Sequence, residues 1–293
     1  MSYIGRFAPS PTGDLHFGSL VAAVASYLQA KVSGGKWLVR IEDIDPPREV
    51  TGSAERIVRD LARFGLVADE PVFFQSRRKA AYEQACQQLL LAGKAYWCGC
   101  SRTDLPPSGV YPGTCRNGMP QGKHARSIRI KVDNDVIRFH DRLQGPQADH
   151  LQFSTGDFVI RRADGLIAYQ LAVVIDDAYQ HISEVVRGAD LLDSTARQIF
   201  LQGCLGLPTP VYAHVPLALL PDGSKLSKRT QSDPIRHEAP AAALRLAMAF
   251  LGHAAPCLDL AGTWDWARNN WSLDKVPRAR AKPFGEYGHA VTL

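Results

Sequence analysis

The N-terminal part of the chain alternates short apolar runs with a helical pattern, and this order constrains the fold more than any other feature. The run Tyr3–Phe7 indicates a strand, and KWLVRI, residues 36–41, is mostly apolar, as in a buried parallel strand. Between them, Leu20, Val24 and Leu28 recur at the spacing of one helical face. A strand, a helix and a second parallel strand form a βαβ unit. The sequence therefore predicts a doubly wound α/β domain of the Rossmann type.

The same alternation resumes after a segment of different composition. In this segment turn residues cluster, and the short alternating runs SIRIKV and VIRF indicate small antiparallel strands. We therefore expect an insertion that divides the Rossmann domain into two halves. The expected parts are residues 1–94 for the first half, 95–164 for the insertion, 165–220 for the second half, and 221–293 for a loop and a mainly helical C-terminal region.

Local patterns predict the individual elements of these parts. Ser53 can cap a helix whose inner face is Ile57, Leu61 and Phe64, with Gly65 at its C-terminal cap. The further elements expected are a helix carrying Leu171, Val174, Ile175 and Ala178, a strand over His181–Arg187, a helix capped by Ser194 that carries Ile199 and Leu201 and ends near Gly206, a strand over Val215–Leu220, and a helix around Pro240–Leu251.

Composition excludes several classes of protein. The 293 residues are 45% hydrophobic and 22% charged, as in ordinary globular proteins, and no stretch approaches the ~20 apolar residues that span a bilayer. The N-terminus lacks the basic and apolar regions of a signal peptide, so we expect a cytoplasmic protein that does not contact membranes. The net charge of +5 permits a polyanionic partner without requiring one.

Two segments could bind a nucleotide. In the first, a proline-rich turn leads to Gly13, His16 and Gly18 at the start of a helix, where unpaired N–H groups and the helix dipole attract anions. His16 can donate to a phosphate oxygen, and Gly18 lets a nucleotide approach the backbone. The second, KLSKR at residues 225–229, places cations where they can neutralise charge that develops on pyrophosphate. Taken singly, each segment could instead be a surface loop.

Together these segments resemble the signatures of class I aminoacyl-tRNA synthetases. PSPTGDLHFGS resembles their HIGH signature and KLSKR their KMSKS signature, with Ser19, Leu226 and Arg229 departing from the usual residues. RFAPSPTG, VRIEDID, YQLAVVIDD, VVRGADLLDSTARQ and AHVPLALLPDGSKLSKR resemble the glutamyl branch of that family. The resemblance implies that ATP with Mg²⁺ is a substrate, that His16, Lys225 and Lys228 are catalytic, and that Gly13, His16, Gly18, Ser19 and Lys228 bind ATP.

The resemblance also implies an L-glutamate pocket. Arg6 and Arg187 can each hold a carboxylate by charge-assisted hydrogen bonds, and Glu42, just past the end of a strand, can take the ammonium. Tyr169 can donate its hydroxyl. Singly, each charged residue could equally be part of a surface salt bridge or a helix cap. The pocket residues implied are Arg6, Phe7, Ala8, Pro9, Ser10, Glu42, Tyr169 and Arg187.

Cysteines cluster in the expected insertion. Six cysteines in a reducing compartment do not suggest a disulfide scaffold, but Cys98, Cys100 and Cys115 have the character of a structural zinc site. Such a site needs a fourth ligand, for which Tyr111, His124 or water are candidates, and the alternative is a loop with free thiols. The resemblance supplies a tyrosine, so Tyr111 completes the expected site of one zinc per chain. Cys86, Cys204 and Cys257 lie in apolar helical contexts and are expected in the core.

The segment after Arg229 is too short for the helical anticodon-binding domain of a glutamyl-tRNA synthetase. This feature, the CxC…Y…C pattern and VRGAD resemble the family of glutamyl-Q tRNA(Asp) synthetases. The resemblance implies a monomer that activates L-glutamate without tRNA and transfers it to queuosine at the wobble position of tRNA(Asp), whose anticodon loop enters the catalytic cleft. Two alternatives remain: an enzyme that charges another acceptor, and a non-catalytic tRNA-binding paralogue.

Overall fold

The computed structural model of the chain describes residues 2–220, 223 and 235–284. The segment with Lys225 and Lys228, where the sequence predicts the KMSKS-type loop, lies outside these residues, and so does the C-terminal end of the chain. Within the described part, no helix is both long enough and apolar enough to cross a membrane.

The N-terminal βαβ unit is present as predicted. Strand β1 (Ile4–Phe7) and strand β2 (Lys36–Ile41) are parallel, and β3 (Phe73–Phe74) extends this sheet beside β2. Helix α1 (Phe17–Val32) connects the first two strands, and its residues Leu20, Val24 and Leu28 are fully buried. The helix is apolar over most of its surface because it lies between the sheet on one side and helices α7 (Pro240–Phe250) and α8 (Leu260–Asn270) on the other.

A second sheet continues the first. Strands β9 (Glu184–Gly188) and β10 (Val211–Val215) are parallel, and β6 (Ile137–Asp141) is parallel to β10 on its other side. A backbone hydrogen bond of 2.9 Å from Ser183 to Ile4 joins β9 to β1. The chain order therefore reverses between β1 and β9, which is the place where open α/β sheets bind ligands at the carboxyl ends of their strands.

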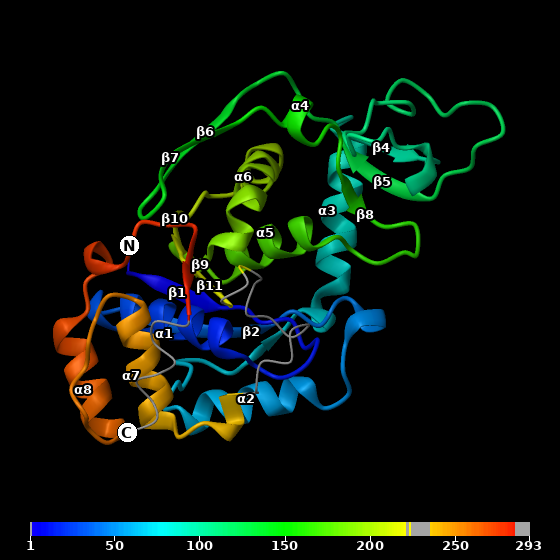
Figure 1. Cartoon of the computed structure of the whole chain (residues 1–293). Coiled ribbons are helices and arrows are strands. Elements are labelled where there is room, and N and C mark those ends of the chain that lie inside the picture. The colour runs from blue at the N-terminus through cyan, green and yellow to red at the C-terminus, as the bar shows by residue number, and fades with distance from the viewer. Residues whose placement is uncertain (1, 221–222, 224–234, 285–293) are drawn as a thin grey trace.

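Helices cover both faces of the strands, as Figure 1 shows. One apolar core joins α1 to residues of α2, α7 and α8, and the other joins residues of α3, α5 and α6. This two-sided arrangement confirms the predicted α/β fold class. The helices are α2 (Ser53–Arg63), α3 (Lys79–Leu91), α5 (Tyr169–Tyr179), α6 (Leu192–Leu205), α7 (Pro240–Phe250) and α8 (Leu260–Asn270), with a short α4 (Leu151–Ser154).

The middle segment forms an antiparallel sheet of β4 (Ala95–Cys98), β5 (Ser127–Ile130) and β8 (Val159–Arg161), set apart from the main sheets in Figure 1. The run SIRIKV thus contains strand β5, and VIRF contains the start of β6 (Ile137–Asp141). Strand β6 forms an antiparallel hairpin with β7 (Gly145–Asp149) and also pairs with β10 of the second sheet. The hairpin therefore belongs structurally to the main sheet, and the domain boundaries given above stay a prediction.

Two expected helix caps are wrong. Helix α2 is capped by Gly52, whose φ of 72° is left-handed, and Ser53 is its first residue. The Ser53 hydroxyl instead donates to the carbonyl of Gly13 at 2.7 Å. Helix α6 starts at Leu192, so Ser194 lies within its first turn. In both cases a tertiary contact or an earlier helix start takes priority over the local capping preference.

Two expected strands have different bounds. The strand expected over Val215–Leu220 is interrupted at Pro216, so that β10 ends at Val215 and β11 (Leu217–Leu219) pairs with β12 (Ala281–Pro283). Proline has no N–H to donate to a ladder, which explains the change of partner. Strand β9 begins at Glu184, because His181 has a φ of 54° and ends the preceding turn.

Candidate active site

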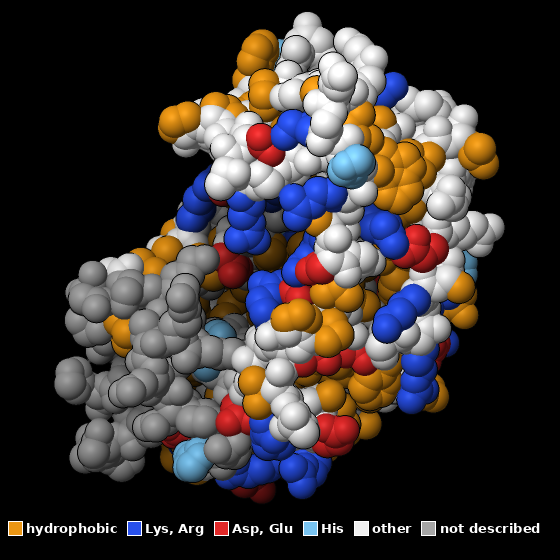
Figure 2. All heavy atoms as spheres, turned by 90° about the vertical axis from the view of Figure 1, so that its right-hand side faces the viewer, with side chains coloured by type: hydrophobic (Ala, Val, Ile, Leu, Met, Phe, Trp, Pro, Cys, Tyr) orange, Lys and Arg blue, Asp and Glu red, His pale blue; other side chains and the backbone are white. Residues whose placement is uncertain are grey.

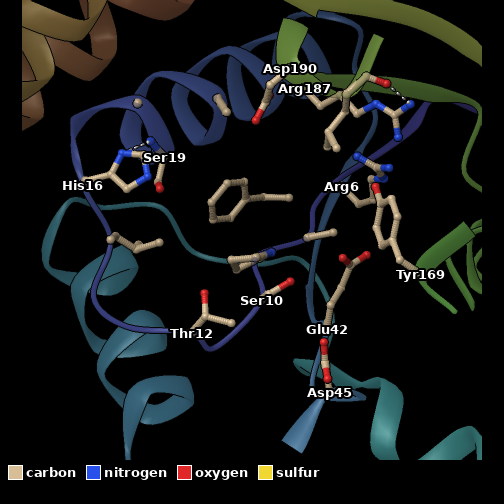
Figure 3. A pocket seen from close by; sticks show the side chains of 18 of the residues that line it. Arg6, Ser10, Thr12, His16, Ser19, Glu42, Asp45, Tyr169, Arg187 and Asp190 are labelled. Atoms are coloured by element: carbon tan, nitrogen blue, oxygen red, sulfur yellow. Dashed lines mark hydrogen bonds between the residues drawn. The ribbon is translucent and has the colours of Figure 1, made fainter. Parts of the chain in front are cut away.

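A cavity of about 800 Å³ opens at the carboxyl ends of β1, β2, β9 and β10. Figure 3 shows His16 and Ser19 at one end of this cavity and Arg6, Glu42, Tyr169 and Arg187 at the other. Gly13 does not line it, although its neighbours Thr12 and Leu15 do. The sequence predicted one group of residues for L-glutamate and another for ATP. Members of both groups line this single cavity: Arg6, Phe7, Ala8, Pro9, Ser10, His16, Gly18, Ser19, Glu42, Tyr169 and Arg187.

The end near α1 has the features of an anion site. His16 occupies the N-cap of this long helix, and its Nδ1 accepts a hydrogen bond of 3.3 Å from the backbone N–H of Ser19. In the neutral ring the proton is then on Nε2, so that nitrogen is a donor. Gly18 and Ser19 belong to the first helical turn, where backbone N–H groups have no intrahelical partner. A phosphate at this end would meet a histidine donor and the positive end of the helix dipole.

The opposite end contains a buried network of three ion pairs. Asp177 of α5 accepts from Arg6 at 3.3 Å and from Arg40 of β2 at 2.8 Å, and Arg40 also donates to Glu42 at 3.3 Å. Burial opposes the charge of Asp177, but Arg6 and Arg40 outweigh it and hold the pKa of this carboxyl below its usual value. For Glu42 burial dominates over the attraction of Arg40, and its pKa is raised. A cationic ligand beside Glu42 would restore its ordinary acidity.

Arg187 on β9 faces the same end of the cavity. Its Nε donates to His214 at 2.9 Å, and its Nη2 donates to the hydroxyl of Thr195 at 2.9 Å and to the carbonyl of Leu191 at 3.3 Å. Its Nη1 is buried and has no hydrogen-bond partner among the described residues. Burial raises the pKa of nearby Tyr169, so its phenol is a neutral donor. The cavity therefore presents two guanidinium groups and one carboxylate at this end, the complement of an amino acid with two carboxylates and one ammonium.

Several polar residues of the site were not expected from the sequence. Arg40, Asp177, Asp141 and His214 are all buried and hold the residues that line the cavity. A signal was available for Arg40, which interrupts the apolar run KWLVRI, because a charge in a buried strand must have a partner. The partner of Arg40 could not be predicted from the sequence, since Asp177 lies far along the chain.

Charged residues also surround the mouth of the cavity. Arg162 donates to Asp45 at 3.1 Å, and Arg48 also pairs with Asp45. Figure 2 shows lysine and arginine side chains gathered along the rim of a hollow in one face of the molecule. Basic groups at a rim favour the approach of a polyanion, because they lower the electrostatic cost of bringing phosphates near the site.

The cysteines of the middle segment converge on one point. The Sγ atoms of Cys98, Cys100 and Cys115 all lie within 4.8 Å of one another, and these side chains are buried. The distance from Cys100 Sγ to Cys115 Sγ is 3.7 Å. Two thiolates about 2.3 Å from one tetrahedral zinc would be about 3.8 Å apart, so the spacing fits a zinc ion.

The Tyr111 hydroxyl completes the same cluster. It lies 3.3 Å from Cys98 Sγ and 3.7 Å from Cys100 Sγ, close to the ~3.5 Å expected between an oxygen and a sulfur ligand of one zinc. Burial opposes ionisation of Cys98, but hydrogen bonds from Tyr111, the Cys100 backbone and Arg129 lower the pKa of this thiol to about 7. The thiolate is the form that binds metal. His124, the alternative ligand, is absent from the cluster found within the described residues.

The other cysteines were expected in the core, and they differ in burial. Cys86 is buried in α3, as expected, and Cys204 is half-buried in α6. Cys257 is exposed in the loop between α7 and α8, so the prediction of a core position was wrong. The apolar neighbours of Cys257, such as Ala254, Pro256 and Leu258, lie in the same loop and are exposed as well.

Comparison with known proteins identifies the class. Residues 4–107 and 113–244 match the family model described as tRNA synthetases class I (E and Q), catalytic domain. A crystal structure of a glutamate tRNA ligase from Elizabethkingia meningosepticum, in complex with its amino acid, superposes with a TM-score of 0.83 at 28% identity and covers 99% of this chain and 69% of that one. The chain belongs to the class I tRNA synthetases of the glutamate and glutamine branch.

Sequence relatives narrow this assignment. Glutamyl-Q tRNA(Asp) synthetase of Dechloromonas aromatica is 53% identical over 289 residues, covering 94% of this chain and 96% of the relative. The proteins of the same name from Chromobacterium violaceum and Pseudomonas aeruginosa are 49% and 50% identical, and 95% and 98% of their lengths are covered. Within its class, the chain belongs to the glutamyl-Q tRNA(Asp) synthetase family.

Proposed function

We propose that the chain uses ATP to convert L-glutamate to glutamyl-adenylate and then transfers the glutamyl group to queuosine at the wobble position of tRNA(Asp). The observation that carries the first step is the charge pattern at one end of the cavity. Arg6 and Arg187 face it as cations and Glu42 as an anion, and Asp177 and Arg40 hold two of these three in place. Family membership and the names of the relatives support the second step.

In the activation step, an oxygen of the glutamate α-carboxylate attacks the α-phosphorus of ATP. The bond from that phosphorus to the oxygen bridging the β-phosphate breaks, and pyrophosphate leaves. We assign His16 and the N-terminus of α1 to the phosphates, where the Nε2 proton and the first-turn N–H groups can oppose developing negative charge. Lys225 and Lys228 are proposed to act on the pyrophosphate. Mg²⁺ would accompany ATP and shield its phosphate charges.

In the transfer step, a hydroxyl of the queuosine cyclopentenediol attacks the carbonyl carbon of the adenylate, and AMP leaves as the ester forms. The hydroxyl proton passes to the phosphate of the departing AMP, so the step needs no base from the protein. Arg48 and Arg162, at the mouth of the cavity, are placed to meet the phosphates of an anticodon loop. We expect the enzyme to act as a monomer in the cytoplasm, where its tRNA substrate is.

We further propose that Cys98, Cys100, Cys115 and Tyr111 hold one structural zinc ion. A four-ligand site of this kind leaves no open position, so the metal would stabilise the β4–β5–β8 sheet and take no part in the reaction. The sulfur spacing and the position of the Tyr111 hydroxyl support this assignment.

Two assays with the same enzyme test the proposal. Glutamate-dependent exchange of pyrophosphate into ATP without RNA tests activation, and transfer of labelled glutamate to tRNA(Asp) with and without queuosine tests the acceptor. We expect exchange without tRNA and transfer only to the queuosine-containing tRNA. Exchange without that transfer would indicate a different acceptor. Absence of exchange at saturating substrates would favour a non-catalytic tRNA-binding protein.

A further inference from the structure

A buried chain of polar groups lies behind Arg187 and has no part in the steps above. Asp141 ends β6 and His214 lies on β10, and both side chains are 0% exposed. Oδ2 of Asp141 is 2.5 Å from Nδ1 of His214, and Nε2 of His214 accepts from Nε of Arg187 at 2.9 Å. Arg187 and His214 are direct partners in the parallel pairing of β9 and β10. The chain thus crosses three adjacent strands.

The hydrogen bonds fix the tautomer of His214. An arginine Nε can only donate, so Nε2 of the imidazole must be the acceptor and cannot carry a proton. The proton of the neutral ring is therefore on Nδ1, where it donates to Asp141. Burial lowers the pKa of His214 to about 4 against the opposing effect of Asp141, and the Arg187 charge adds to the lowering. The ring is neutral at physiological pH.

Asp141 is itself held by the main chain. Its Oδ1 accepts the backbone N–H groups of Leu143, Gln144 and His214 at 3.0, 2.9 and 3.1 Å. These bonds tie the turn after β6 to β10. The carboxylate cannot rotate without breaking several bonds, so it fixes the plane of the imidazole.

These contacts leave one nitrogen of the Arg187 guanidinium without an assigned partner among the described residues. Nε is bound by His214, and Nη2 by Thr195 and Leu191. Nη1 remains buried without a partner among the described residues, on a side chain that lines the cavity. A buried donor that lacks an acceptor is costly unless a ligand supplies one.

We propose that Asp141 and His214 are positioning residues that aim Nη1 of Arg187 at the side-chain carboxylate of the substrate, and that they thereby set the selectivity for glutamate over glutamine. This inference rests on the proposed role of Arg187 in glutamate binding. A fixed, fully charged donor favours a carboxylate over a neutral amide, because the charge-assisted hydrogen bond is stronger and the donor cannot turn away from an amide NH₂ group. A guanidinium able to swing would find other partners and would discriminate less.

Two substitutions of His214 separate positioning from simple packing. His214→Gln can place an amide oxygen near the position of Nε2 and accept from Arg187. His214→Asn reaches only the position of Nδ1, so it can donate to Asp141 but leaves Nε of Arg187 without an acceptor. We expect His214→Asn to raise the KM for glutamate about 10-fold or more and to lower the ratio of kcat/KM for glutamate over glutamine. His214→Gln should remain within a few-fold of the wild type, and the KM for ATP should not change in either variant.

A second background and a spectroscopic measurement complete the test. In an Arg187→Lys background, which removes the Nε donor, the Asn and Gln variants should give equal KM values for glutamate. In wild-type protein, ¹⁵N NMR of the His214 ring should show the proton on Nδ1 at neutral pH, whether or not a variant folds. Equal effects of Asn and Gln in the wild-type background, a parallel rise in the KM for ATP, or a proton on Nε2 would each overturn the positioning role. Absence of glutamate-dependent exchange by the wild type would refute the proposed function instead, and the tautomer would still test the chain of hydrogen bonds.

Discussion

The carboxylate of Asp177 should contribute strongly to the stability of the protein. It is 5% exposed and is the shared partner of Arg6 and Arg40, which are 3% and 0% exposed. The substitution Asp177→Asn keeps the shape of the side chain and removes its charge. Arg40 then retains only Glu42 as an ion-pair partner within the described residues, and Arg6 loses its ion pair. Both guanidinium groups stay buried, because their strands remain in the sheet.

The expected loss of unfolding free energy in Asp177→Asn can be compared with the loss at a surface ion pair. Removing one partner of a buried ion pair costs about 3–5 kcal/mol, because the other charge is left uncompensated. The matched control is Glu70→Gln. Glu70 pairs with Lys36 at the surface, where the Lys36 side chain is 58% exposed and the Glu70 side chain 47% exposed. This substitution should lower the free energy of unfolding by less than about 1 kcal/mol. Urea unfolding followed by circular dichroism measures both free energies of unfolding. Because Arg6 would lose its orientation, the KM for glutamate should also rise in Asp177→Asn alone. A loss of unfolding free energy as small as that of Glu70→Gln would refute the reasoning.

Three further predictions concern other parts of the molecule. His16→Ala should lower the activation rate about 10²-fold. His16→Asn can still cap α1, so it should lower the rate but keep the thermal stability. Equal activation rates for His16→Asn and the wild type would show that His16 has no catalytic role. Purified protein should contain one zinc per chain by elemental analysis. Cys98→Ser should lose the zinc, and Tyr111→Phe should bind it more weakly. A zinc content well below one per chain in the active wild type would refute the site. Folding keeps His214 neutral by lowering its pKa from 6.5 to about 4, so the unfolded chain takes up a proton first as pH falls. Stability should therefore decline by about 3 kcal/mol between pH 6.5 and 4 through this group, and His214→Gln should show a shallower decline in urea titrations across that window.

The fold could be predicted because hydrophobic periodicity is local. The inner faces of α1 and α2 follow from residues three to four apart, and those residues are buried as expected. Element ends were less predictable, since tertiary contacts decide them. Ser53 has the chemistry of a cap but bonds to Gly13 instead, and Pro216 passes the chain from one sheet to another. The prediction that Cys257 is buried was wrong for a related reason, since apolar neighbours in sequence need not form one buried face.

The residues that line the cavity could be expected from their chemistry and from resemblance, whereas those that hold them could not. Arg6 and Arg187 stood out as cations near strand ends, next to motifs that suit a nucleotide. Their partners Asp177 and His214 carry no comparable signal, because neither the Asp176–Asp177 pair nor a lone His214 in an apolar run shows which residue it will contact. The bond from Arg6 to Asp177 joins residues 171 apart in the chain, and no pattern of local spacing encodes it.

Sheet register explains why these distant charges meet. The hydrogen bond from Ser183 to Ile4 places β9 beside β1, so Arg6 and Arg187 reach the carboxyl edge of neighbouring strands. The pairing of Arg187 with His214 puts both side chains on the same face of β9 and β10. Successive residues of a strand point to opposite faces, so a slip of one residue between β9 and β10 would turn His214 away from Arg187. If β10 slipped in this way, Ala213 and Val215 would leave the apolar core that α1 shares. The burial that stabilises the sheet therefore also fixes the register on which the direction of Arg187 depends.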